Sequence, residues 1–256
     1  MGIDHLDYDV RGHTAEITMT RAPVNAINAG LSQDVNAAYR RARDDDAVRS
    51  VILTSDFDRA FSAGMDLDMM AGGSGMDLRR FLETFYFEMH DLQYRMGKPT
   101  IAALTGPARA AGVTLAVSCD ALIASETASL AYPEIDVGLI PAMHFVHLPR
   151  QIGRHRAFEL LFSGEPIEAT EAERLGLYND VVSHADVLER ARDLAETFNE
   201  KSPVVMELAR DSFVRAQDLD YRRNIENVVE TICNIIETEA AQEGLSAFQE
   251  GREPDW

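Results

Sequence analysis

The chain has 256 residues, of which 46% are hydrophobic and 26% are charged, a composition typical of a folded globular protein with a sizeable core. Its formal net charge of −19 argues against a nucleic-acid-binding surface and against adhesion to anionic lipid. Any site for an anionic group must therefore be local, built from an arginine cluster or from a helix N-terminus.

Targeting signals are not evident in the sequence. No apolar run approaches the roughly 20 residues that a membrane-spanning helix needs, and residues 1–6 lack the basic and apolar regions of a secretory signal. The two cysteines, Cys119 and Cys233, both lie in apolar stretches, which indicates buried thiols rather than a disulfide framework. We therefore expect a cytoplasmic protein.

The predicted elements of the first two thirds alternate between strands and helices. Ala15, Ile17 and Met19 alternate with polar residues, which predicts a half-buried strand. Further strands are predicted at 51–53, 100–104 and 121–124, and helices over 31–42 and 78–95. Strands separated by helices favour parallel pairing, so the sequence predicts an α/β fold.

The last quarter of the chain contains only helical patterns. Apolar stripes recur at helical spacing over 204–213 and again over 225–236, after the strand signals stop near residue 185. Such faces pack either on the sheet domain or between subunits, and the pattern leaves both readings open. We divide the chain into a core domain, 1–195, and a helical oligomerisation region, 196–256.

Two turns rich in small residues each follow a predicted buried strand. They span Phe61–Leu67 and Gly106–Gly112, and the second opens a helix near Ala111. Either turn alone indicates only a tight connection. Together they offer two opposed backbone N–H groups, the donors that a thioester oxygen needs when the neighbouring carbon loses a proton.

A proton acceptor for that reaction is present in the segment 131–138. Glu134 is flanked there by apolar residues at the predicted end of a strand. Burial would raise the pKa of this carboxyl and suit it to carry a proton near neutral pH. A glutamate beside proline is more often a solvated loop residue, and the local pattern alone does not decide between the two.

Five segments in order resemble the motifs of the crotonase superfamily, the enoyl-CoA hydratase/isomerase family, over essentially the whole length. They are Pro23–Ala26 (P-x-N-A), Phe61–Leu67 (F-x-A-G-x-D-L), Gly106–Asp120 (N-G-x-A-x-G-G-G…C-D), Tyr132–Pro141 (P-E…G…P) and Glu243–Arg252 (E-G-x-x-A-F…R). Each motif is weak alone, but their shared order is specific. The resemblance implies a spiral of ββα turns followed by a helical trimerisation region, in a homotrimer or a dimer of trimers.

The same resemblance assigns roles by position. Met65 and Ala111 would supply the two N–H groups of an oxyanion hole, and Glu134 would be the catalytic carboxylate. The substrate would be an acyl-CoA thioester, with no cofactor besides the CoA it carries and no metal. The residues expected at the CoA or acyl group are Arg21, Arg59, Ala63, Gly64, Asp66, Leu67, Thr114 and His144.

Departures from the family pattern narrow the expected reaction. Thr114 stands where hydratases carry one of two catalytic glutamates. A single carboxylate can take a proton from one carbon and return it to another, so double-bond isomerisation ranks first. A hydratase or lyase with another second group ranks next. A thioester hydrolase and a CoA-ester-binding relative without chemistry are the remaining alternatives.

The histidines invite three further hypotheses. His144 and His147 have the i, i+3 spacing of a metal pair, but no further ligand accompanies them, and we expect packing, or for His144 a polar place in the acyl pocket. His90 lies on a helix where some superfamily members carry a catalytic histidine. A satisfied helical histidine is the favoured interpretation there.

Overall fold

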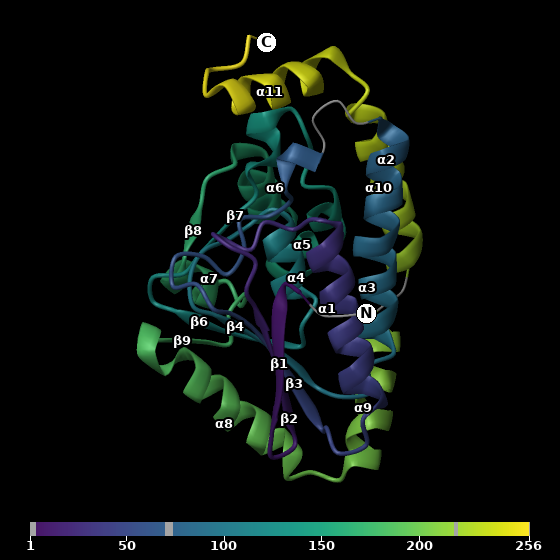
Figure 1. Cartoon of the computed structure of the whole chain (residues 1–256), viewed down its shortest axis with the longest axis vertical. Coiled ribbons are helices and arrows are strands. Elements are labelled where there is room, and N and C mark those ends of the chain that lie inside the picture. The colour runs from purple at the N-terminus through teal and green to yellow at the C-terminus, as the bar shows by residue number, and fades with distance from the viewer. Residues whose placement is uncertain (1–3, 70–73, 218–219, 256) are drawn as a thin grey trace.

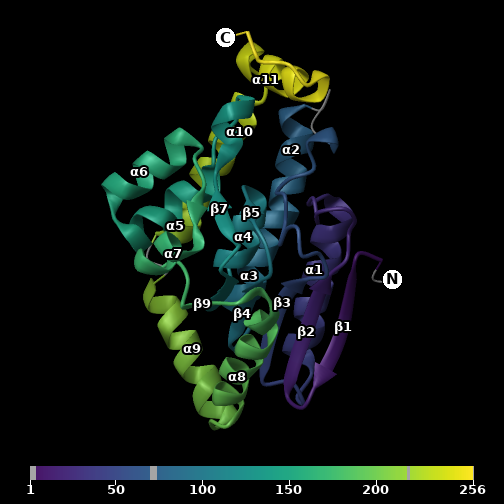
Figure 2. The same cartoon turned by 90° about the vertical axis from the view of Figure 1, so that its left-hand side faces the viewer.

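The computed structural model describes residues 4–69, 74–217 and 220–255, and within these ranges it contains two β-sheets with helices packed around them (Figures 1 and 2). The strands are β1 (Leu6–Arg11), β2 (Thr14–Met19), β3 (Ser50–Ser55), β4 (Thr100–Leu104), β5 (Ala108–Arg109), β6 (Ala121–Ser125), β7 (Ser129–Ala131), β8 (Ile167–Glu168) and β9 (Asp180–Val182). The larger sheet has the order β1-β2-β3-β4-β6-β9 and the smaller the order β5-β7-β8. In the larger sheet β1 and β2 form an antiparallel hairpin and the other pairs are parallel, which confirms the predicted α/β fold.

Along the chain, helices are interspersed with the strands as far as β9, and only helices follow it. They are α1 (Ala29–Asp44), η1 (Leu67–Met69), α2 (Gly75–Leu82), η2 (Glu83–Glu88), α3 (Met89–Tyr94), α4 (Ala111–Val117), η3 (Pro133–Val137), α5 (Ala142–Ile152), α6 (Arg154–Ser163), α7 (Ala169–Arg174), η4 (His184–Asp186), α8 (Val187–Asn199), α9 (Pro203–Gln217), α10 (Tyr221–Ile235) and α11 (Glu239–Glu250). The predicted boundary at residue 195 lies inside α8. The division of the chain there stays a prediction.

Both faces of the larger sheet are covered, which explains its nearly continuous apolar strands. Ile52 packs toward α8, which crosses beneath the sheet in Figures 1 and 2, while its neighbours Val51 and Leu53 face the main core. The expectation of a half-buried β2 was wrong for the same reason. Glu16 of β2 is only 5% exposed, because Arg192 of α8 covers it and donates from Nε to its carboxylate at 2.6 Å.

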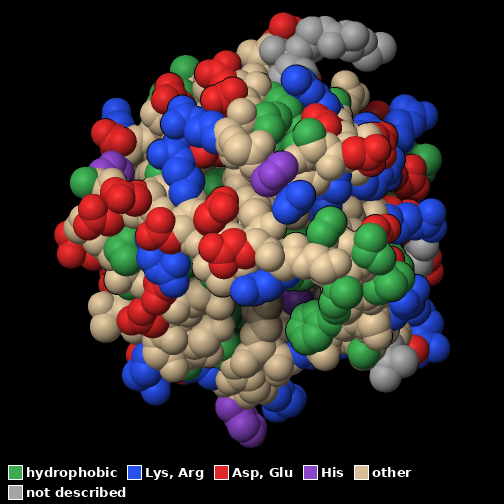
Figure 3. Space-filling model, turned by 90° about the horizontal axis from the view of Figure 1, so that it is seen from below, with side chains coloured by type: hydrophobic (Ala, Val, Ile, Leu, Met, Phe, Trp, Pro, Cys, Tyr) green, Lys and Arg blue, Asp and Glu red, His purple; other side chains and the backbone are tan. Residues whose placement is uncertain are grey.

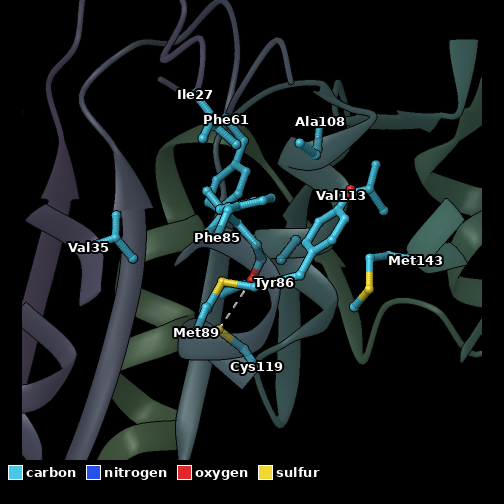
Figure 4. Packing of buried hydrophobic residues seen from close by; sticks show 14 of the residues in the cluster. Ile27, Val35, Phe61, Phe85, Tyr86, Met89, Ala108, Val113, Cys119 and Met143 are labelled. Carbon is cyan, nitrogen blue, oxygen red and sulfur yellow. Dashed lines mark hydrogen bonds between the residues drawn. The ribbon is translucent and has the colours of Figure 1, made fainter. Parts of the chain in front are cut away.

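The predicted helix over 78–95 is present, but its middle is wound differently. The segment η2 is a π-helix that joins α2 to α3. The side chains of Phe85 from η2 and Met89 from α3 gather with Val35 and Val113 in the main core (Figure 4). Cys119 lies at the edge of the same cluster, 3.6 Å from the Tyr39 hydroxyl.

The two thiols are buried and free. Burial raises the pKa of Cys119 to about 12, and burial also raises the pKa of Cys233. Neither thiol is therefore ionised near neutral pH.

The two long C-terminal helices differ in environment. The apolar face of α10, with Ile225 and Val229 at most 1% exposed, packs within the chain against α5 and α2. The apolar face of α9 remains open, with Leu208 and Phe213 more than 60% exposed. Figure 3 shows this region from below, where hydrophobic side chains gather on the right-hand side of the molecule over α9. Among the described helices, none has the length and apolarity to cross a lipid bilayer.

Candidate active site

Two loops that follow β3 and β4 run side by side at the centre of the molecule. Ser62 pairs with Ala108 in a parallel bridge, and the Arg109 N–H donates to the Ser62 carbonyl at 3.0 Å. Beyond this bridge Met65 pairs with Ile27, and Gly64 lies against the Arg109 carbonyl and Ala110. The two turns singled out in the sequence are therefore neighbours in space.

Glycines make the close approach of these loops possible. A Cβ on Gly64 would lie 2.8 Å from the Arg109 carbonyl oxygen, and a Cβ on Gly112 would lie 2.7 Å from the Ser62 Cβ. Gly64 also has a φ of +92°, which side chains rarely adopt. Both positions require glycine, because a side chain at either one would push the two loops apart.

The early loop with the P-x-N-A pattern ties the first of these turns to the sheet. The buried Asn25 amide donates to the Phe61 carbonyl at 3.1 Å and to the Ser55 hydroxyl at 2.8 Å. In return the Ser62 hydroxyl donates to the Asn25 carbonyl at 2.7 Å. The loop therefore fixes the segment that leads into Met65.

The two predicted oxyanion donors are both available. The N–H group of Met65 and that of Ala111, the first residue of α4, donate to no acceptor among the described residues. Both residues line the same cavity. The preceding residue, Ala110, has a φ of 48° and a ψ of −121°, which turns the chain sharply before the helix begins.

A cavity of about 550 Å³ opens in front of these N–H groups, within the size range of small-molecule sites. Its wall contains the following residues from the sequence prediction: Ala63, Met65, Asp66, Leu67, Ala111 and Glu134. The other predicted residues, Gly64, Arg21, Arg59, Thr114 and His144, do not belong to this wall. Their predicted contacts with substrate stay untested predictions.

Glu134 lies on η3, directly after β7, and faces the cavity. Its Oε2 is buried and has no hydrogen-bond partner among the described residues. Burial raises the pKa of this carboxyl to about 8, although a bond to its own backbone lowers it slightly. A carboxyl with this pKa both accepts and returns a proton near neutral pH.

Other acidic side chains at the cavity are paired or exposed. The Asp66 carboxylate accepts from the Arg21 guanidinium at 2.7 Å. Arg21 therefore holds a residue of the cavity wall but does not line the cavity itself. Asp136 is exposed and points toward Gly164, where a Cβ would lie 2.7 Å from its Oδ2. Arg59 is exposed on the preceding loop.

Thr114 and His144 lie behind the cavity wall. Thr114 is 3% exposed, and its hydroxyl lies 3.3 Å from Nε2 of His144. His147 and His90 line a separate cavity of about 150 Å³. In the part of the chain that the structure describes, no three histidine, cysteine or carboxylate side chains gather as metal ligands.

Three further wall residues were not singled out in the sequence. Tyr86 reaches the cavity from the π-helical turn, and burial followed by the charge of Glu134 raises the pKa of its phenol, while a hydrogen bond with Thr114 lowers it. Phe248 and Arg252 come from α11 and the chain just after it. The E-G-x-x-A-F…R motif could have indicated these two, whereas periodicity does not reveal a π-turn.

Comparison with known proteins places this geometry in a family. The family model of enoyl-CoA hydratase/isomerase matches residues 10–256. Carnitinyl-CoA dehydratase of Proteus mirabilis is 33% identical over 98% of this chain and 97% of its own length. A probable enoyl-CoA hydratase of Bacillus subtilis is 32% identical, over 94% of each chain.

Solved structures give the same result. An enoyl-CoA hydratase from Bacillus anthracis superposes with a TM-score of 0.80 at 30% identity, covering 99% of both chains. One from Mycobacterium avium subsp. paratuberculosis, at 21% identity, shares the fold with a TM-score of 0.86 over 100% of this chain and 99% of its own. The chain belongs to the enoyl-CoA hydratase/isomerase family, the crotonase superfamily, and is an enzyme of that family that acts on CoA thioesters.

Proposed function

We propose that the protein moves a carbon–carbon double bond within an acyl-CoA thioester. The thioester oxygen accepts from the Met65 and Ala111 N–H groups, which stabilises the charge that develops there by about 3–4 kcal/mol per donor. Glu134 removes a proton from the α-carbon to give a dienolate and returns it to the γ-carbon. The reverse direction uses the same groups, and no cofactor besides the bound CoA is needed.

The observation that carries this proposal is the buried, unpaired carboxylate oxygen of Glu134 in the cavity wall that Met65 and Ala111 also line. Among the described wall residues, Glu134 combines a place in the cavity with a buried carboxylate oxygen that has no partner. Thr114 stands where a second carboxylate would serve water addition, and it lies behind the wall. One acid–base group suffices for proton relocation within a single molecule.

The part of the wall formed by α11 and the residues after it is where we place the coenzyme portion of the substrate. Phe248 and Arg252 belong to it, and both are substantially exposed. The Arg252 guanidinium donates to Glu243 and Glu250, which pair with it on α11. A thioester that enters from this side places its carbonyl at the N–H groups and its acyl chain toward Tyr86.

Hydration or dehydration is the second candidate, because the relatives named above are hydratases and a carnitinyl-CoA dehydratase. In this reading the Tyr86 phenol, which stays protonated because its pKa is raised, would take the place of the absent carboxylate as a proton donor. The two reactions share the oxyanion hole and Glu134, and they differ in whether water is gained or lost.

A product analysis separates the candidates. The protein is incubated with 2-enoyl-, 3-enoyl- and 3-hydroxyacyl-CoA esters, and the products are analysed by mass and ultraviolet absorbance. Isomerisation leaves the mass unchanged and shifts the absorbance of the conjugated thioester, whereas hydration adds the mass of one water. Water gain without any positional isomer contradicts the first proposal and supports the second.

Replacing the carboxylate tests whether it acts chemically. Glu134→Gln should lower kcat by about 10²–10⁴-fold while acyl-CoA binding persists, because an amide keeps the shape but cannot carry the proton. Glu165→Gln is the matched control, because this carboxylate is exposed and lies outside the cavity wall. An unchanged rate in the glutamate variant would favour a CoA-binding relative without chemistry.

We also propose that the open face of α9 is covered by other subunits in a homotrimer or a dimer of trimers. Val204, Val205, Leu208 and Phe213 are each more than 60% exposed on this helix. Exposed apolar side chains gathered on one helix mark an association surface in proteins of this size.

A further inference from the structure

His144 contacts the peptide group whose other end is the Ala111 N–H. Its Nε2 lies 3.2 Å from the Ala110 carbonyl oxygen. The carbonyl of Ala110 and the N–H of Ala111 belong to one planar peptide unit, so a bond that fixes the oxygen also fixes the direction of the N–H. The histidine is 1% exposed and does not line the substrate cavity.

The Ala110 carbonyl already accepts from the N–H groups of Val113 at 2.9 Å and Thr114 at 3.3 Å, and His144 adds a bond from outside α4. Ala110 has a φ of 48°, a backbone conformation that glycine adopts readily and that residues with a side chain rarely adopt. The resemblance to the family places a glycine run at Ala110–Gly112, and here the first two positions carry methyl groups. The hydrogen bonds to this peptide therefore stabilise a backbone conformation that glycine would adopt without strain.

The hydrogen bonds determine which nitrogen of His144 carries the proton. A carbonyl oxygen only accepts, so Nε2 must donate to Ala110. Nδ1 of the neutral ring is then an acceptor, and Nε2 of His147 lies 3.2 Å from it. His147, whose ring also bonds to the Met143 backbone, packs edge-on against His144 with ring centroids 4.9 Å apart and so holds the His144 ring in place.

The surroundings keep both rings neutral and in place. Burial, then the neighbouring His147, holds the pKa of His144 well below its usual value, and burial lowers the pKa of His147 to about 4. Tyr132 packs edge-on against the His144 ring with centroids 4.5 Å apart. The Thr114 hydroxyl, 3.3 Å from Nε2, lies beside the same donor.

We propose that His144, held by His147, is a positioning residue that orients and polarises the Ala110–Ala111 peptide so that its N–H points at the thioester oxygen. This inference rests on the proposed oxyanion hole. It assigns His144 a role through the main chain, without contact with the acyl group. The effect grows as negative charge develops on the thioester oxygen, so it acts on kcat more than on substrate binding.

The test compares two substitutions that differ in one donor. His144→Phe keeps the ring and its contact with Tyr132 but removes Nε2, and His144→Gln restores an amide N–H near the same position. Removal of a whole oxyanion donor costs about 10²–10³-fold in kcat, and we expect the loss of its orientation to cost about tenfold or more in His144→Phe. KM should stay within about twofold, and His144→Gln should recover most of the rate.

A spectroscopic measurement separates this role from a structural one. The carbonyl stretch of an acyl-CoA bound to the folded protein reports how strongly the thioester is polarised. It should shift toward the free-ligand frequency in His144→Phe and return in His144→Gln. This measurement requires binding but no turnover, so it remains decisive even if the wild-type protein shows no isomerase activity.

Three results would overturn the proposal. One is an unchanged carbonyl stretch and kcat in a folded His144→Phe. Another is an equal loss in both variants at wild-type thermal stability, because the donor would then be irrelevant. The last is a pH dependence of the rate that is present in the wild type and absent from both variants. That result would make His144 an acid–base group at the substrate. Should His144→Phe fail to fold, His147→Gln replaces it, with a smaller expected loss of kcat and the same shift.

Discussion

The two walls of the cavity are built differently. The wall formed by Met65, Ala111 and Glu134 consists of loops that contact one another through main-chain atoms. The wall formed by α10 and α11 presents side chains such as Ile232 and Phe248. The comparison teaches that the groups proposed for chemistry are fixed by the backbone of the core, whereas the groups proposed for binding are side chains of the C-terminal helices.

The two walls meet where α11 packs on η3. A Cβ on Gly244 would lie 2.6 Å from the Val137 carbonyl carbon, and one on Gly138 would lie 2.8 Å from the Ala241 Cα. The C-terminal helix is therefore seated against the helix that carries Glu134. Changes in the core wall should act on kcat and stability, and changes in the helical wall should act on KM.

The largest effect is expected where the core loops touch. Gly64→Ala combines an unfavourable φ with a clash against the Arg109 carbonyl, and we expect a loss of about 2–4 kcal/mol in unfolding free energy. Displacement of the neighbouring Met65 N–H should lower kcat about 10²-fold. Gly12→Ala is the control, since Gly12 has a φ of +60° but no atom within 4 Å of the added methyl. Equal effects of the two variants on kcat would contradict the role of the loop contact.

The pKa of Glu134 predicts a pH dependence of rate. The carboxylate must be ionised to accept a proton, so kcat/KM should rise about tenfold per pH unit below an apparent pKa of about 8 and then level off. Glu134→Gln should lack this limb in its residual activity. A wild-type profile that is already flat at pH 6 would contradict the raised pKa.

The same carboxyl predicts a pH dependence of stability. Its pKa is about 8 in the folded chain and near 4.5 when exposed, so between these values the folded state holds more protons than the unfolded state. The contribution of this group to the free energy of unfolding therefore falls as pH rises through that window. Urea unfolding at several pH values should show a steeper decline for wild type than for Glu134→Gln. Parallel curves would mean that the carboxyl is solvated.

A smaller effect is expected in the helical wall. Phe248→Ala should raise KM for the acyl-CoA about fivefold, equivalent to about 1 kcal/mol of lost contact, and leave kcat within about twofold. Phe158→Ala is the matched control, because Phe158 is similarly exposed on α6 and lies outside the cavity. A fall in kcat without a change in KM would show that the two walls are not separable in this way.

The smallest effect on rate is expected on α9, far from the donors. Leu208→Glu should reduce the molecular mass measured by light scattering, because a charge in the proposed subunit contact cannot be paired there. Thr197→Glu adds the same charge to an exposed position on α8 and should leave the mass unchanged. A lower molecular mass of the assembly in both variants would indicate general destabilisation.

Much of the core wall could be predicted from the sequence because it depends on local rules. Small residues after buried strands indicate tight turns, and the order of five motifs indicates the fold. The parallel bridge between Ser62 and Ala108 then brings the two turns together. The apolar neighbours of Glu134 left its role open, and its match to the P-E…G…P motif identified it. Burial is the cause of its raised pKa.

The sequence was less informative where the environment depends on distant segments. The burial of Glu16 requires Arg192, far along the chain, so β2 looked half-buried. Tyr86 reaches the cavity because a π-turn rotates its position, which no periodicity shows. The helical stripes of α9 and α10 have the same pattern, although one is covered within the chain and the other is open.

The burial of both cysteines has a practical consequence for assays. Cys119 and Cys233 are shielded from solvent and protonated at neutral pH, so they react slowly with thiol reagents that develop colour. Such a reagent would therefore report the free coenzyme released by thioester cleavage with little background from the native protein. A hydrolase side activity could be measured directly, during turnover, without first blocking the enzyme's own sulfhydryls.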